Sequence, residues 1–120
     1  MLNLNTVDLK TLDLTHVPTV LREAKASAVE AAREMYGRVG ERDMCGFAWV
    51  TVYGVRSNSR LGKVLAANGF SKAYGGGLQL WDPAGLGTQS ISVKEAGASA
   101  YANVLSVELG LRAYASSRLD

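Results

Sequence analysis

The chain opens on a stretch in which apolar and polar positions alternate. Apolar residues recur among polar neighbours throughout residues 1–14, at Leu2, Leu4, Val7, Leu9, Leu12 and Leu14. Such an alternation is typical of a strand with one buried face, and it also fits an arm that packs on a neighbouring subunit. Residues 1–17 are thus a candidate N-terminal arm, and the period alone does not choose between an arm and a loose strand.

The apolar positions take a helical spacing from Thr19 to Tyr36. The face that they form is rich in alanine and consists of Leu21, Ala24, Ala28, Ala31, Ala32 and Met35. Pro18 suits the first turn of a helix, and Gly37 and Gly40 favour its termination. Because alanine lets another helix approach closely, we expect this face to pack in the core, with a subunit contact as the alternative.

A strand and a short helix follow. Residues 47–53 are aromatic, β-branched or small, which predicts a strand that Gly54 ends. Either Asn58 or Ser59 can cap the next element, a short helix that runs to Asn68.

The second half of the chain predicts two more strands and a helix. A glycine run at 75–77 predicts a turn into a strand at 78–81, and residues 82–85, with the sequence Asp-Pro-Ala-Gly, are typical of a turn. Ser92 and Glu95 have the spacing of a capping box, which predicts that a helix begins there.

That last helix reaches Leu105 and is closed by Gly110, after which residues 111–115 predict a third strand. The element order is therefore helix, strand, helix, strand, helix, strand. This order predicts a single domain over residues 1–120 of class α/β, with α+β as the alternative. The second and third strands, joined by a helix, fit a right-handed crossover. Three strands leave two sheet edges, which favour self-association.

Composition narrows the function classes. A hydrophobic fraction of 48% and a charged fraction of 20% are typical of a folded domain of this length. The formal net charge of +2 argues against a protein that coats DNA or RNA. No apolar run reaches the length of a membrane span, and the N-terminus lacks a secretion signal. The single cysteine, Cys45, is expected to be buried and favours a reducing compartment, so we expect a cytoplasmic protein.

The usual catalytic and cofactor motifs are missing. Gly62-Lys63 lacks the flanking residues of a Walker A phosphate loop, and Leu80 stands where a dinucleotide fingerprint after the glycine run needs its last glycine. His16 is the only histidine, which leaves no pattern for metal binding or for histidine-based catalysis. We therefore expect no enzymatic activity, no metal and no cofactor.

The remaining signal is recognition of a polar, ring-bearing anion. Arginine pairs with phosphate oxygens and stacks on rings, an exposed tryptophan stacks on a nucleobase, and amides or carboxylates read base and ribose edges. The candidate ligand-binding residues are Arg56, Asn58, Ser59, Arg60, Trp81, Gln89, Arg118 and Asp120. The alternatives are a solvated loop with a helix cap at 56–60, a core tryptophan at 81, and an ion-paired sheet edge at the C-terminus.

Several motifs together resemble a known family. The segments 45–50 (CGFAWV), 58–63 (NSRLGK), 80–85 (LWDPAG) with Gln89, 95–98 (EAGA) and 113–120 (AYASSRLD) resemble the first-described Thoeris anti-defence family, small proteins of tailed phages. The resemblance covers about residues 30–120, whereas residues 1–29 match no pattern of the family.

The resemblance implies a protein that sequesters bacterial immune signals in the cytoplasm of the infected host. Its implied ligand is glycocyclic ADP-ribose made by TIR-domain enzymes, bound without cleavage. It further implies a second site for cyclic oligonucleotides and a homo-oligomer built from dimers, up to a hexamer. Two other functions stay open, an interaction protein that inhibits a host macromolecule and a small cyclic-nucleotide hydrolase.

Overall fold

The central strand of the protein, β1 (Gly46–Tyr53), has small aliphatic side chains on one side and large rings on the other. Ala48, Val50 and Val52 are buried in the hydrophobic core. The residues between them therefore point to the opposite face of the sheet, because side chains alternate along a strand. This alternation decides which face the helices cover.

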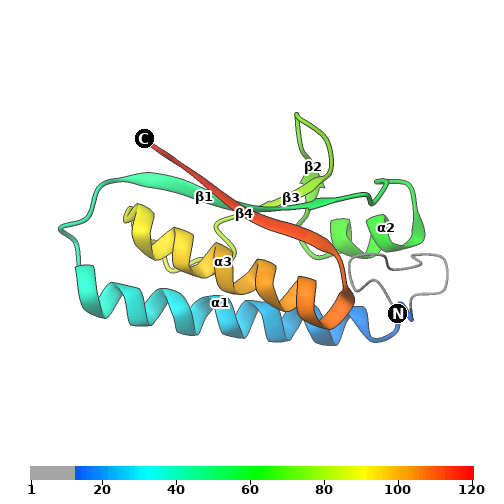
Figure 1. The fold of residues 1–120 in the computed structure, drawn as a ribbon, viewed down its shortest axis with the longest axis horizontal. Helices are drawn as coiled ribbons and strands as arrows, with labels where there is room; N and C mark the ends of the chain where they lie inside the picture. Colours follow the sequence, from blue (N-terminus) through cyan, green and yellow to red (C-terminus); the bar gives the residue numbers. More distant parts are fainter. Residues whose placement is uncertain (1–12) are drawn as a thin grey trace, which may run out of the picture.

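The computed structural model describes residues 13–120, in which a four-stranded sheet carries its helices on one face (Figure 1). The elements after β1 are α2 (Arg60–Ala67), β2 (Ser71–Lys72), β3 (Leu78–Trp81), α3 (Ile91–Leu109) and β4 (Arg112–Leu119), and α1 (Val17–Val39) precedes them all. The sheet order is β2-β3-β1-β4, and every neighbouring pair is antiparallel. From β1 onward this is the split βαβ arrangement of ferredoxin-like topology.

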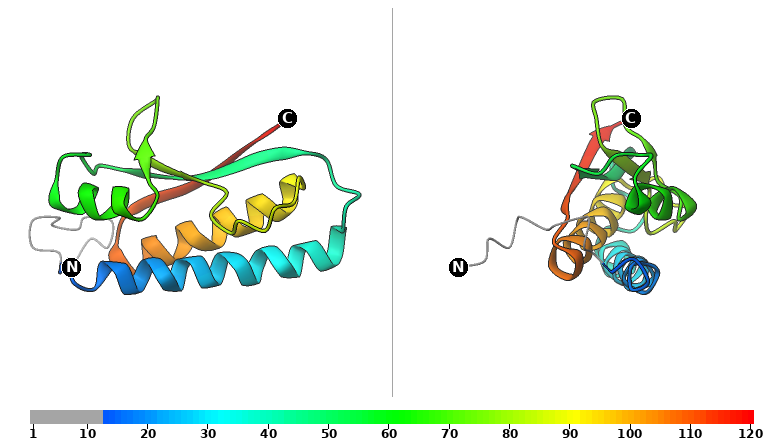
Figure 2. Two further views of the ribbon diagram at one scale, coloured as in Figure 1. Left: turned by 180° about the vertical axis from the view of Figure 1, so that it is seen from behind. Right: turned by 90° about the vertical axis from the view of Figure 1, so that its right-hand side faces the viewer.

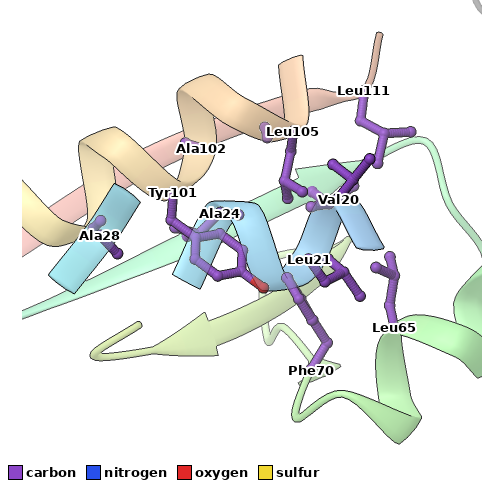
Figure 3. Packing of buried hydrophobic residues seen from close by; sticks show 14 of the residues in the cluster. Val20, Leu21, Ala24, Ala28, Leu65, Phe70, Tyr101, Ala102, Leu105 and Leu111 are labelled. Carbon is purple, nitrogen blue, oxygen red and sulfur yellow. The ribbon is translucent and has the colours of Figure 1, made fainter. Parts of the chain in front are cut away.

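The helices build the core in two steps. α3 packs on the sheet beneath β1 and β4, and α1 packs on α3 and lies farther from the sheet (Figures 1 and 2). Figure 3 shows Ala24 and Ala28 of α1 facing Tyr101 of α3, in the same cluster as Leu65 of α2. The alanine-rich face of the first helix is thus a core face, as its spacing predicts.

Helix α3 packs closely against α1 and the 82–85 turn at Gly97. A Cβ atom at this position would lie 2.9 Å from the Cβ of Ala84 and 3.4 Å from the carbonyl oxygen of Ala28. Lys25 fixes the same loop from the other helix, because its ammonium donates to the carbonyl oxygens of Pro83 and Ala84 at 2.9 and 3.0 Å. Helix α1, helix α3 and the 82–85 turn therefore pack as one unit.

The structure confirms a helix-first, mixed α/β single domain with three helices. The sheet has four strands, whereas the sequence predicts three. The additional strand is β2, whose two residues are too few to leave a pattern in the sequence. The last strand continues to Leu119, beyond the predicted end at residue 115. Strands β3 and β4 run parallel to each other, as a crossover requires, but β1 lies between them.

The predicted capping box at Ser92 and Glu95 is wrong. The N-cap of α3 is Ser90, whose side chain accepts from the backbone N–H of Val93. Glu95 accepts a hydrogen bond from the Ser117 hydroxyl at 2.8 Å instead of folding back onto its own helix. Two serines two residues apart both fit a cap in the sequence, and the structure has the first of them, Ser90, in that position.

Two further predictions meet the structure in part. The candidate N-terminal arm at residues 1–17 lies outside the described residues except for its last five positions, of which Val17 already belongs to α1. Over residues 13–120, none of the helices has the length and apolarity needed to cross a membrane.

Gly97→Ala is expected to destabilise the protein by about 1–3 kcal/mol, because the added methyl group overpacks the α1–α3 contact. Gly37→Ala is the matched control, since Gly37 is also helical and a Cβ there would meet no atom within 4 Å. The control should stabilise by about 0.5–1 kcal/mol through helix propensity. Urea unfolding of the three proteins measures both effects, and equal midpoints would contradict the packing described here.

Candidate functional site

The eight candidate residues fall into two groups at opposite ends of β1. Arg118 pairs with Phe47 near the start of β1, whereas Arg56 comes three residues after its end. An eight-residue strand spans roughly 23 Å. The structure therefore divides the expected pocket into a group at the start of β1 and a group after its end.

Two residues of the group after β1, Arg56 and Asn58, line an open cavity of about 540 Å³. The cavity lies between the loop that leaves β1 and the β2–β3 hairpin, and its lining comprises Val55, Arg56, Ser57, Asn58, Lys72, Ala73, Gly76, Gly77 and Leu78. Arg56 and Lys72 give the lining two cations and it has no carboxylate. Lys72 was not among the candidate residues, because a lone lysine in a short polar segment has no pattern in the sequence.

Two residues of this group, Ser59 and Arg60, do not line the cavity. The Ser59 hydroxyl caps α2, since it accepts from the backbone N–H of Gly62 at 3.0 Å and donates to the carbonyl oxygen of Arg56 at 2.6 Å. Arg60 is the first residue of α2 and is exposed, outside the cavity lining. Of the four candidate residues here, Arg56 and Asn58 are the two that face the cavity.

The group at the start of β1 is built around three aromatic rings. Trp81 of β3 stacks on Trp49 of β1, with ring centroids 4.7 Å apart and an interplanar angle of 26°. Phe47 meets Trp81 edge-on at 6.1 Å. Trp81 is 42% exposed, so it is a surface residue, and the alternative of a core tryptophan is excluded. We call Phe47, Trp49 and Trp81 the aromatic cluster.

Two cations flank the Phe47 ring. The Arg118 guanidinium lies 5.4 Å from the ring centroid, and the Lys94 ammonium lies 5.3 Å from it. Lys94 is only 9% exposed, and among the described residues its ammonium has one hydrogen-bond partner, the Gly46 carbonyl oxygen at 2.9 Å. Lysine carries three donors, and burial of a charge costs free energy unless it is paired.

Neither cation has a carboxylate partner in the part of the chain that the structure describes. The ion pair within 4.0 Å there joins Arg38 to Glu34, on α1 and far from the cluster in the sequence. The outward positions of β1, β3 and β4 also carry neither Asp nor Glu. The two cations beside the Phe47 ring are thus not neutralised by an ion pair among the described residues, an arrangement that suits an anion with a ring.

Gln89 and Asp120 belong to this end of the molecule by their backbone contacts. The Gln89 carbonyl oxygen accepts from the Gly46 N–H at 3.1 Å, and the Asp120 N–H donates to the Cys45 carbonyl oxygen at 3.1 Å. Both side chains are exposed. Cys45 is exposed as well, in contrast to the burial expected for it. Four candidates, Trp81, Gln89, Arg118 and Asp120, therefore share one end of the sheet.

The nearby N-terminus of α3 is not open to a ligand. The Asp43 carboxylate accepts from the Ser90 hydroxyl at 2.6 Å and from the Ser92 backbone N–H at 2.7 Å. A carboxylate at this position satisfies free backbone donors and the helix dipole. The hydrogen bond from Ser90, followed by those from Ser92, lowers the pKa of Asp43 to about 2.

Sequence reasoning missed Lys94, Phe47 and Trp49 as site residues. The sequence places Lys94 in the first turn of a predicted helix, and its burial follows from the way α3 crosses the start of β1. The sequence places Phe47 and Trp49 in a predicted strand, and their alternation with Ala48 could have assigned them to the face opposite the core.

The described residues contain no group of three or more His, Cys, Asp or Glu side chains that could hold a metal ion. Searches against protein-family models, curated proteins and solved structures find no match to this chain.

Asp43 should give the folded protein an acid-sensitive link between β1 and α3. Its folded pKa is below the ordinary value of 3.8, so its contribution to stability is complete above about pH 4 and is lost as the pH falls toward 2. Asp43→Asn lacks this ionisation, so the stability difference between wild type and variant should shrink across that window. Carboxyl-detected NMR titration checks the pKa directly, and a value near 4 would refute the proposed hydrogen-bond network.

Proposed function

We propose that this protein is a phage anti-defence protein that binds and sequesters a nucleotide immune signal without cleaving it, in the cytoplasm of the infected bacterium. The ligand that the family resemblance favours is glycocyclic ADP-ribose. The observation that carries the proposal is the buried Lys94 ammonium, which has no anionic partner among the described residues and lies beside Arg118 and an exposed aromatic cluster.

The arrangement matches the chemistry of a nucleotide. A nucleobase stacks on the exposed side of Trp81, as bases do on aromatic platforms. The phosphate oxygens accept charge-assisted hydrogen bonds from Arg118 and Lys94, which supply the donors that a pyrophosphate needs. Gln89 and Asp120 are close enough in the fold to bind base or ribose edges. Sequestration requires affinity and abundance, and it needs no reacting group.

The cavity after β1 is our candidate for the second, cyclic-oligonucleotide site that the resemblance implies. Arg56 and Lys72 supply cations, and Asn58 supplies an amide that can bind a base edge. The length of β1 separates this cavity from the aromatic cluster, so substitutions at one site should leave the other unchanged.

The edge strand β4 supports the proposed homo-oligomer. It pairs with β1 along all eight residues, and its other edge carries no strand within residues 13–120 (Figure 2). Open edges of this length pair readily with another chain. Light scattering at micromolar concentration should give a mass that is a multiple of two chains. A stable 12.8 kDa species would contradict the oligomer but not the ligand site.

Lys94→Met and Arg118→Gln should each weaken binding of glycocyclic ADP-ribose by about 10- to 150-fold, because a hydrogen bond to a charged group contributes about 1.5–3 kcal/mol. Trp81→Ala should cost a stacking interaction of about 1–3 kcal/mol. Tyr74→Ala is the matched control, since Tyr74 is fully exposed at the tip of the hairpin. Titration calorimetry, paired with thermal melts, measures each effect.

The fate of the ligand separates the proposed function from its alternatives. The ligand released by heating the complex should be intact by mass spectrometry. A cleaved ligand would indicate a hydrolase. A folded wild-type protein that binds no nucleotide would favour the interaction protein, in which the exposed rings act as interface anchors.

A further inference from the structure

The open face of the sheet carries a second aromatic site that resembles the first. Tyr53 at the end of β1 and Tyr114 of β4 have ring centroids 5.9 Å apart, and the Arg112 guanidinium lies 6.0 Å from the Tyr53 ring. The strand register repeats the pairing of the first site, because Arg112 lies opposite Tyr53 as Arg118 lies opposite Phe47. We call Tyr53, Tyr114 and Arg112 the second station.

The aromatic cluster and the second station lie on the same face of the sheet. Trp49 and Tyr53 are four residues apart on the outward side of β1, which corresponds to about 13 Å. Between them lie Thr51, which is buried and opposite Tyr114, and Ser116, which is exposed and opposite Trp49. The helices α1 and α3 cover the opposite face, and within the described residues no helix lies over this one (Figures 1 and 2).

The charge on this face is not that of the whole chain. The net charge of +2 predicts that no nucleic-acid polymer is a partner. That value, however, averages over both faces of the sheet. The outward positions of the strands hold Arg112 and Arg118 and no acidic residue. A polymer that contacts this face alone therefore meets cations and aromatic rings.

We infer that the open face binds linear single-stranded nucleic acid, with one base stacked at Trp81 and another at the second station. The inference rests on the proposed nucleotide site at the aromatic cluster and extends its ligand class. Exposed aromatic residues on the open face of a four-stranded antiparallel sheet are a known platform for unpaired bases. About four stacked nucleotides cover 13 Å at 3.4 Å per nucleotide, and fewer do so when the bases are splayed.

The residues of the face also predict the form of the binding. Two arginines contact about two phosphates, which gives a salt dependence with a log–log slope of about −1.4 for a single strand. Stacking recognises any base, so sequence preference should be weak. A duplex hides its ring faces and should bind much more weakly than either strand.

The test uses the full chain and three probes: AMP, a fluorescent hexauridylate RNA and the corresponding hexathymidylate DNA. The hexamers should bind at least tenfold more tightly than AMP by anisotropy competition. Tyr114→Ala should weaken hexamer binding by about 5- to 150-fold, the equivalent of one stacked base, and leave AMP binding unchanged. Tyr114 is 55% exposed, so the variant should fold, and Tyr74→Ala is again the control.

Each outcome decides the inference. Hexamers that bind no better than AMP, or a Tyr114→Ala variant that binds hexamers like wild type, would overturn it and leave the proposed nucleotide site in place. Binding of hexamers but not AMP would support the face, and the titration with glycocyclic ADP-ribose would still decide the proposed function separately. A Tyr114→Ala variant with a smaller assembly mass and unchanged hexamer binding would assign the face to a second copy of the chain and overturn the inference.

Discussion

The two-sided character of β1 is the constraint on which both the fold and the site depend. Its inward residues are small enough for α3 to lie close beneath the sheet, and three of its outward residues, Phe47, Trp49 and Tyr53, carry aromatic rings. A shift of register by one residue would exchange the two faces completely. The same hydrogen-bonded ladder that fixes the core therefore also fixes the spacing between the aromatic side chains and the arginines of β4.

Close packing of α1 against α3 explains why the sheet can leave one face open. A two-layer domain of this size usually has to bury most of its apolar residues between a sheet and its helices. Here α1 forms a second helix layer, and its alanine-rich face packs against the side of α3 that points away from the sheet. This layer enlarges the core without covering the aromatic rings on the open face. Gly97 and Ala28 make this layer possible because neither has a side chain beyond Cβ that would separate the helices.

The sequence allowed the order and the type of the long elements to be predicted, because those depend on local patterns. The helical period of the alanine face, the branched and aromatic run of β1 and the final glycine of α3 all mark their elements. The site could be predicted only in part. Arg118 and Trp81 could be chosen as candidates from the chemistry of their side chains. Their proximity to Lys94 and their distance from Arg56 depend on strand pairing across the whole chain, which no local pattern contains. The two-residue strand β2 and the true cap of α3 depend on tertiary partners that no local window contains.

The exposed thiol of Cys45 makes this end of the molecule directly observable. It is the single cysteine of the chain, and its backbone carbonyl is hydrogen-bonded to the last residue, next to the strand that carries Arg118. A maleimide dye would therefore attach at one defined place beside the aromatic cluster without any substitution. The native chain thus offers its own reporter position, from which occupancy and exchange of a bound ring could be followed in real time by quenching.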